Sequence, residues 1–198
     1  STNDMSEGMR VADPRVLMVD DEKTVADAYA LRLEDVADVS VAHSGPGALD
    51  ALDDGRVPDV VLLDRHMPGM SGDEVLERIR ERELETRVIM VTAIDPGLGV
   101  LDMPFDDYLS KPVDREDLLA AVDQQCQVLA YELLGEYFSL ESTRAVVDAQ
   151  LPAQAGEDDG ELDELESRLD VVERRIRALL PDAEELLSSF DGIDRNEY

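Results

Sequence analysis

The chain of 198 residues is 43% hydrophobic, which suits one ordinary domain with an appendage or two small domains. Acidic residues outnumber lysine and arginine by 48 to 18, for a formal net charge of −30, and they occur along the whole chain. The longest aliphatic runs, such as residues 15–19 and 60–63, are too short to cross a bilayer, and no signal-peptide pattern opens the chain, so we expect no membrane association. The one cysteine, Cys126, excludes an internal disulfide, and a reducing cytoplasmic location is therefore expected.

The kinds of charged residue carry further information. Aspartate (28) is commoner than glutamate (20), and only two lysines occur, Lys23 and Lys111. The repulsion among these negative charges would destabilise a compact fold in dilute buffer. At about 1 M salt the Debye length falls to about 3 Å, and most of this repulsion is screened. The composition resembles that of halophilic proteins and predicts a chain adapted to a salty cytoplasm.

In chain order, residues 1–13 are polar and lack hydrophobic periodicity, which predicts a disordered leader. Short aliphatic segments then alternate with helical patterns. The expected strands are 15–19, 39–42, 59–63, 87–91 and 107–110, and the expected helices are 22–36, 45–52, 73–83 and one beginning near residue 115, with at most a short helix in 94–104. This alternation is typical of βα units, so we predict an α/β domain with a parallel sheet over residues 14–125.

The stretch VLLDRHMPGMSG at 61–72 shows how one of these strands ends. Its aliphatic residues suit a strand that is buried on both faces, and Pro68, Gly69 and Gly72 prevent a helix before about Ser71. Asp64 is therefore expected at the carboxyl end of the strand, where open α/β sheets bind ligands. A turn-initiating aspartate is the ordinary alternative, and this stretch by itself does not decide between the two.

Other strands also end beside reactive side chains. Asp20 and Asp21 follow the first strand, Asp64 the third, Thr92 the fourth and Lys111 the fifth. Each has an ordinary explanation as a helix cap, a turn residue or a surface lysine. Together they would place three carboxylates, a hydroxyl and an ammonium at one edge of the sheet, which favours a functional site.

Such a cluster has a definite chemistry. Neighbouring carboxylates repel one another and need a cation or raised pKa values, and oxygen ligands without histidine or cysteine favour Mg²⁺. The ammonium of Lys111 can pair with a carboxylate or with a phosphoryl oxygen. A divalent metal and a lysine around a nucleophilic carboxylate are typical of phosphoryl transfer, here with an aspartyl phosphate as the product.

Four motifs occur in the order and at the intervals typical of receiver domains of two-component response regulators: VDDE at 19–22, LLDRHMPGMSG at 62–72, VTA at 91–93 and DDYLSKP at 106–112. Residues 14–125 closely resemble this family. The resemblance implies a doubly wound, five-stranded parallel sheet in the order 2-1-3-4-5. It also implies a sensor histidine kinase as phosphoryl donor and no enzyme activity beyond the domain's own phosphoryl acceptance and autodephosphorylation.

The same resemblance makes Asp64 the phosphoacceptor. The protein ligands of Mg²⁺ would be three carboxylates and one backbone carbonyl, those of Asp20, Asp21, Asp64 and His66. Lys111 would contact the phosphate, and Thr92 and Tyr108 would form the switch pair. In this switch the Thr92 hydroxyl moves to the phosphoryl group, and the Tyr108 ring turns into the space that it leaves.

The helical pattern that begins near residue 115 continues well past the end of a receiver, so residues 126–198 are expected to form a helical domain. An acidic, glycine-containing loop at 152–160 interrupts the pattern, and a second helix is expected at 161–180. Its apolar residues follow alternating steps of three and four, as in a coiled-coil seam: Leu162, Leu165, Leu169, Val172, Ile176 and Leu179. Two such helices predict an antiparallel hairpin or an intermolecular bundle.

Two stretches of this tail, YELLGEYFSLESTRAVVDAQL at 131–151 and ELDELESRLDVVERRIRALL at 161–180, resemble the HalX domain attached to receivers in haloarchaea. This agrees with the salt-adapted charge. We therefore expect a phosphorylation-controlled signalling protein whose tail passes the receiver's state to a downstream protein partner or to a second copy in a homodimer.

Other functions are less favoured. A transcriptional regulator that binds DNA through the tail is the main alternative, but residues 127–198 contain 19 acidic and 6 basic side chains and no basic patch that could release counterions. A phosphatase acting on external substrates is disfavoured because His66, not a second carboxylate, stands two residues after Asp64. A receiver fold that never accepts phosphate is disfavoured by the complete set of acidic, hydroxyl and lysine residues.

Overall fold

The computed structural model describes residues 13–93, 97–100, 102–150 and 159–189. They form two compact units, one within residues 13–129 and the other within residues 130–189, and helix α4 (Arg115–Gln150) contributes to both. The predicted leader lies outside the described residues except for residue 13. No helix among the described residues is both long and apolar enough to span a bilayer.

The first unit is built on a five-stranded sheet. Its strands are β1 (Arg15–Val19), β2 (Asp38–Ala42), β3 (Val60–Leu63), β4 (Arg87–Thr92) and β5 (Asp107–Ser110). All neighbours pair in parallel, in the order β2-β1-β3-β4-β5, so the predicted fold class is confirmed. Parallel neighbours require crossover connections, and here these are helical.

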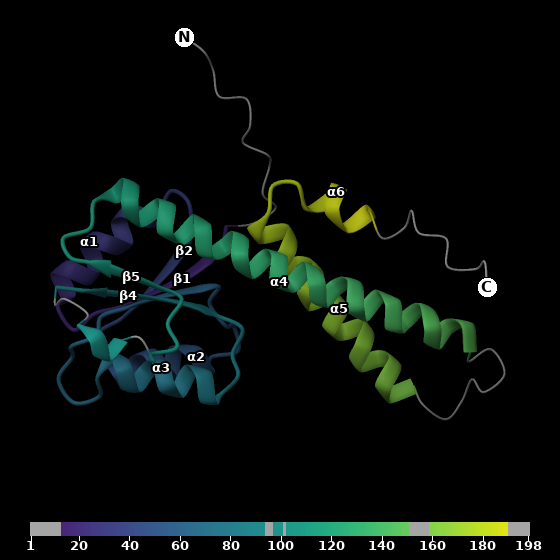
Figure 1. Ribbon diagram of the computed structural model, residues 1–198, viewed down its shortest axis with the longest axis horizontal. Helices are drawn as coiled ribbons and strands as arrows, with labels where there is room; N and C mark the ends of the chain where they lie inside the picture. The colour runs from purple at the N-terminus through teal and green to yellow at the C-terminus, as the bar shows by residue number, and fades with distance from the viewer. Residues whose placement is uncertain (1–12, 94–96, 101, 151–158, 190–198) are drawn as a thin grey trace, which may run out of the picture. The chain divides into compact units, whose positions relative to one another are not determined.

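Helices cover both faces of this sheet (Figure 1). Helices α2 (Gly45–Asp53) and α3 (Gly72–Glu81) lie on one face, and α1 (Lys23–Leu33) with the first turns of α4 lies on the other. The central strands are therefore buried on both sides, and all four residues of β3 are fully buried. The side chains between the sheet and α2/α3 form one hydrophobic cluster. Burying each large aliphatic side chain contributes about 1.5–3 kcal/mol to the stability of the fold. This packing holds the strands, and therefore their ends, in place.

Several helix boundaries differ from the predicted ones for local reasons. Helix α1 begins one residue later than predicted because Glu22 has an extended backbone, and it ends at Leu33 rather than at residue 36. The carbonyl of Leu33 accepts the backbone N–H groups of Val36 and Ala37, which closes the helix. Helix α3 ends at Glu81 rather than at residue 83, where Glu83 has a positive φ of 52° that no helix continues.

The second unit contains the rest of α4, helix α5 (Asp159–Leu179) and the short helix α6 (Ala183–Ser188). Helix α5 runs back along α4, so the two form an antiparallel pair (Figure 1). The Arg168 guanidinium joins them through Nε and Nη2, which lie 2.7 and 2.8 Å from the two carboxylate oxygens of Glu136. The seam residues Leu169, Val172 and Ile176 are buried, as a helical hairpin requires.

Two expectations for this unit need correction. The loop predicted at 152–160 is shorter at its end, because α5 already begins at Asp159; its residues 152–158 lie outside the described part of the chain. Helix α6 was not predicted as a helix. It is only six residues long, and it buries Ala183 and Leu187, so it depends on tertiary packing more than on a periodic pattern of its own.

Candidate functional site

The acidic residues that follow β1 and β3 meet at one edge of the sheet. Asp20, Asp21 and Asp64 each offer a carboxylate oxygen, and these oxygens all lie within 4.8 Å of one another. Asp20 is fully buried, Asp64 is 7% exposed and Asp21 is half-buried. The Glu22 backbone N–H donates to Asp20 Oδ1 at 2.9 Å, which orients that carboxylate. β1 and β3 are neighbours in the parallel sheet, so their carboxyl ends bring together side chains far apart in the sequence.

Lys111, which follows β5, completes the cluster. Its Nζ pairs with Asp20 Oδ2 and lies 3.7 Å from Asp64 Oδ2. Burial lowers the pKa of the Lys111 ammonium, but its hydrogen bond to Asp20 and the charge of Asp64 outweigh that effect, and the pKa is raised overall. Lys111 is therefore a fixed positive charge between two carboxylates.

The pKa of the Asp64 carboxyl group is also perturbed. Burial raises the pKa of its carboxyl group; the charge of Lys111 lowers it, and the charge of Asp20 raises it again, leaving a raised value overall. A hydrogen bond from the His66 backbone N–H acts in the lowering direction. The Lys111 ammonium therefore offsets only part of the cost of a charged Asp64, and a further cation at the site would favour the charged form.

The donor set fits Mg²⁺. The three carboxylates offer only oxygen, and hard divalent ions prefer oxygen ligands. The predicted fourth ligand, the backbone carbonyl of His66, belongs to the turn directly after Asp64; the His66 side chain is exposed. These residues form the candidate metal site, with Lys111 at its side.

The turn after β3 explains why methionine, proline and glycine follow Asp64. Gly69 has a φ of 75°, which favours glycine, and the Ser71 hydroxyl caps α3 by accepting the Glu74 N–H at 3.2 Å. Gly72 donates its N–H to the Arg65 carbonyl at 2.9 Å. A Cβ at Gly72 would lie 2.1 Å from the Asp64 carbonyl oxygen, so only glycine lets α3 begin this close to the acidic site.

The predicted switch residues lie on the last two strands. Thr92 ends β4 and is 1% exposed, and Tyr108 lies within β5 and is half-buried. Tyr108 is paired with Met90, two residues before Thr92, so side-chain alternation places Thr92 and Tyr108 on the same face of the sheet. The Lys111 N–H donates to the Thr92 carbonyl at 2.8 Å. The structure thus places the two predicted switch residues on one face of the sheet and joins Thr92 through the backbone to Lys111.

The sequence interpretation missed residues that support this site from a distance. The buried Tyr29 hydroxyl on α1 accepts the Val113 N–H at 3.0 Å and holds the segment that follows Lys111. An aromatic at an apolar helical position carries no sequence signal for this contact, because its partner is 84 residues away in the chain.

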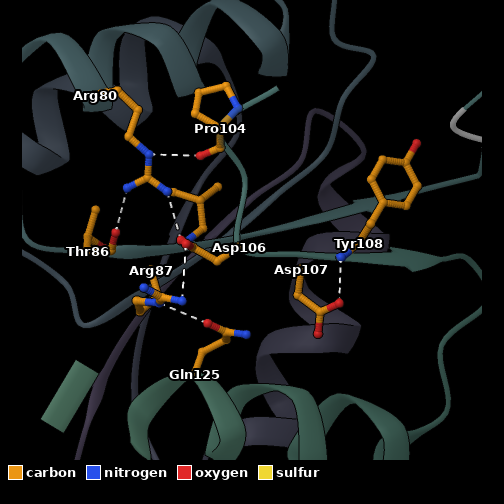
Figure 2. A network of polar contacts seen from close by, with 9 residues as sticks. Arg80, Thr86, Arg87, Pro104, Asp106, Asp107, Tyr108 and Gln125 are labelled. Atoms are coloured by element: carbon orange, nitrogen blue, oxygen red, sulfur yellow. Dashed lines mark hydrogen bonds and ion pairs between the residues drawn. The ribbon is translucent and has the colours of Figure 1, made fainter. Parts of the chain in front are cut away.

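A second missed feature is the polar network in Figure 2, near the start of β4. Asp106 receives Arg80 Nη2 at 2.8 Å and lies 3.2 Å from Arg87 Nη2. Arg87 Nε also donates to Gln125 Oε1 at 2.9 Å, so the network connects α3, β4 and α4. The ring of Tyr108 points away from it (Figure 2). Asp106 belongs to the motif DDYLSKP, which was its only sequence signal.

Comparison with known proteins agrees with this geometry. The profile of the response regulator receiver domain matches residues 16–123, and that of the HalX domain matches residues 127–191. A protein of Haloferax volcanii, described as a candidate transcriptional regulator, is 46% identical over 143 residues, which are 71% of this chain and 24% of that protein. YkoG of Bacillus subtilis, an uncharacterized transcriptional regulatory protein, is 40% identical over 111 residues, or 54% of this chain and 48% of YkoG.

Solved structures give the same result for the first unit. A CheY-like receiver domain protein of Methanospirillum hungatei has 27% sequence identity and a TM-score of 0.57, covering 61% of this chain and 99% of that one. The BeF3-activated receiver domain of DrrB, from Thermotoga maritima, has 31% identity and a TM-score of 0.52, covering 58% and 98%.

The chain spans between a quarter and about half of the length of the curated relatives. The haloarchaeal relative supports the halophilic interpretation of the charge. The acidic site, the strand order and the profile matches agree, and the chain belongs to the response regulator receiver family of two-component systems, with a HalX domain following the receiver.

Proposed function

We propose that the chain accepts a phosphoryl group on Asp64 from a sensor histidine kinase and that this modification controls its signalling state. One observation carries the proposal: the Asp64 carboxylate lies with Asp20 and Asp21 in one cluster and 3.7 Å from the Lys111 ammonium. A carboxylate nucleophile, two further acidic ligands and a fixed cation are the parts that phosphoryl transfer to an aspartate needs.

In the proposed step, an Asp64 oxygen attacks the phosphorus of a phosphohistidine. The oxygen–phosphorus bond forms while the phosphorus–nitrogen bond breaks, and the released imidazole takes up a proton. Lys111 neutralises the added negative charge, because its Nζ already faces both Asp20 and Asp64. The chain would catalyse only this acceptance and its own dephosphorylation.

Asp20, Asp21, Asp64 and the His66 backbone carbonyl would hold Mg²⁺. Bound there, the ion would neutralise charge on the phosphoryl oxygens. Without the ion, the neighbouring carboxylates repel one another. Burial raises the pKa of the Asp64 carboxyl group, Lys111 lowers it, and the charge of Asp20 raises it again.

We further propose that Thr92 and Tyr108 change conformation in response to the phosphoryl group. The Thr92 hydroxyl would donate to a phosphoryl oxygen, and the Tyr108 ring would turn inward on the face of the sheet that both share. The helical tail would pass the change to a downstream protein partner or to a second copy of the chain. Among the described residues of α4, the exposed apolar side chains of Val128, Tyr131 and Val146 offer surface for such a contact.

DNA binding through the tail is the second candidate, because several relatives are described as transcriptional regulators. The chain covers 24–50% of those proteins, so their output activity need not reside in the matched part. Residues 127–198 carry 19 acidic and 6 basic side chains, a charge balance that disfavours direct contact with phosphates.

The test is labelling of the full chain with acetyl phosphate and Mg²⁺ in molar KCl, read by intact mass. We expect one phosphoryl group on the native chain and none on Asp64→Asn. Asp27→Asn on α1, which changes an exposed carboxylate, is the matched control and should label normally. Labelling that persists in Asp64→Asn would show that the acceptor lies elsewhere.

A further inference from the structure

The strand register places Tyr108 in line with the strand that carries the acidic site. Leu63 on β3 pairs with Met90 on β4, and Met90 pairs with Tyr108 on β5. Side chains in one such row point to the same face of a sheet. Leu63 and Met90 belong to the cluster beneath α2 and α3, and Tyr108 packs against the same cluster. Tyr108 therefore faces α3, not α1.

Arg65 lies on this same face. It stands two residues after Leu63, in the turn that follows β3, and its contact with α3 shows where its side chain lies. There its Nε donates to both carboxylate oxygens of Asp73, in the first turn of α3, at 3.1 and 3.3 Å. The side chain is only 18% exposed.

Burial lowers the pKa of the Arg65 guanidinium, but hydrogen bonds to Tyr108 and Asp73 outweigh that effect and raise it overall, which places the Tyr108 side chain within hydrogen-bonding reach of Arg65. Neighbouring strands lie about 4.8 Å apart, so β3 and β5, with β4 between them, are separated by about 10 Å. An arginine and a tyrosine reaching toward each other are long enough to span that gap. Arg65, the residue directly after Asp64, thus connects the turn that follows β3 to the start of α3 and to Tyr108 on β5.

The Tyr108 ring also has an aromatic contact, which differs in character from the contact with Arg65. The Phe105 ring packs against it edge to face, with centroids 5.5 Å apart. This apolar contact has no donor or acceptor that would hold the hydroxyl in one place. The hydrogen bond from Arg65 does so, and the pairing with Asp73 limits the freedom of the guanidinium that makes it.

We propose that Arg65 is a positioning residue for the switch: it holds the Tyr108 hydroxyl outside the site and opposes the inward turn of the ring. This inference rests on the proposed function. An inward turn breaks a hydrogen bond to a charged group, so Arg65 reduces the population of the active-like conformation by about tenfold in the unmodified chain. Because it is bound to Tyr108 and Asp73, the residue next to the acceptor sets how readily the receiver switches.

The experiment is titration of the full chain with beryllofluoride and Mg²⁺ in molar KCl, with the Tyr108 ring followed by NMR. Arg65→Gln and Tyr108→Phe should each tighten the apparent beryllofluoride affinity about tenfold, and the double variant should gain no more than either single one. Without beryllofluoride, the Tyr108 ring signals of Arg65→Gln should move toward their positions in the bound native chain. Arg82→Gln, which removes another guanidinium paired with an aspartate, is the matched control and should change neither readout.

Asp73→Asn provides a second variant that leaves Arg65 in place, should Arg65→Gln fold poorly. It releases one anchor of the guanidinium and should tighten beryllofluoride binding by a smaller factor. Unchanged affinity and unchanged ring signals, or gains from Arg65→Gln and Tyr108→Phe that multiply in the double variant, would overturn the role of Arg65. The two failures are distinguishable. If the native chain binds no beryllofluoride and accepts no phosphoryl group, the proposed function fails; if it does both, the outcomes above reject only the role of Arg65.

Discussion

Replacing Asp64 by asparagine should stabilise the metal-free protein. The substitution keeps the shape of the side chain and removes its charge from a cluster in which burial already raises the pKa of the carboxyl group. At an effective dielectric constant of about 20, each repulsion at the 4.8 Å limit of the cluster amounts to about 3 kcal/mol, and the attraction of Lys111 at 3.7 Å to about 4 kcal/mol.

Because Asp64 faces two carboxylates and one ammonium, repulsion exceeds attraction. The net effect is about 2 kcal/mol, to which burial adds and from which salt removes a part. We expect Asp64→Asn to raise the free energy of unfolding by about 2 kcal/mol in molar KCl without Mg²⁺. Chemical denaturation measures it, and Asp27→Asn, at an exposed position on α1, should change stability little.

The effect has a defined pH dependence. A carboxyl group whose pKa is higher in the folded than in the unfolded state binds more protons when folded, so stability falls as the pH rises through the folded-state pKa. The advantage of Asp64→Asn should therefore be complete above that pKa and should shrink as the pH falls toward the ordinary carboxyl value. Mg²⁺ should stabilise the native chain more than the variant. A variant less stable than the native chain at neutral pH without Mg²⁺ would refute the charge argument.

Two further substitutions test the frame around the site. Gly72→Ala would place a Cβ 2.1 Å from a backbone oxygen and should lower the free energy of unfolding by about 3 kcal/mol. Gly135→Ala, in open space on a helix, should raise it by about 0.5–1 kcal/mol. Thermal unfolding compares the two variants. Equal effects would show that the loop relaxes around the new methyl group. Tyr29→Phe leaves the Val113 N–H without its partner and should lower the free energy of unfolding by about 1–2 kcal/mol. Tyr131→Phe, at an exposed position, is the control and should change it very little. Urea denaturation measures both, and equal losses would contradict the role of the Val113 contact.

The sequence predicts the strands of the receiver well because they are short, aliphatic and buried on both faces. β3 is the clearest case: an uninterrupted aliphatic run, ended by Asp64 and a turn of proline and glycine, leaves few alternatives. Reactive residues at strand ends could also be identified, since parallel strands direct their carboxyl ends to one edge. The order of the strands came from the resemblance to a family, because periodicity does not specify which strands are neighbours.

Helix ends were predicted less accurately. The end of α1 depends on two N–H groups that share the Leu33 carbonyl, and the end of α3 on the positive φ of Glu83. Helix α6 is too short to show a period, and its burial of Ala183 and Leu187 gives it stability that its sequence does not display. Such details follow from backbone geometry and packing, which vary more than the hydrophobic pattern does.

By itself, the sequence determined an acidic, salt-adapted chain with an α/β domain, a helical tail and a set of reactive residues at strand ends. Only the tertiary structure decided how those residues meet: Lys111 lies between Asp20 and Asp64, and Arg65 pairs with Asp73 at the start of α3. The physical reason is one of range. Hydrophobic periodicity reports on the residues within one element, whereas ion pairs and hydrogen bonds between elements depend on distances that exist only after the sheet has formed.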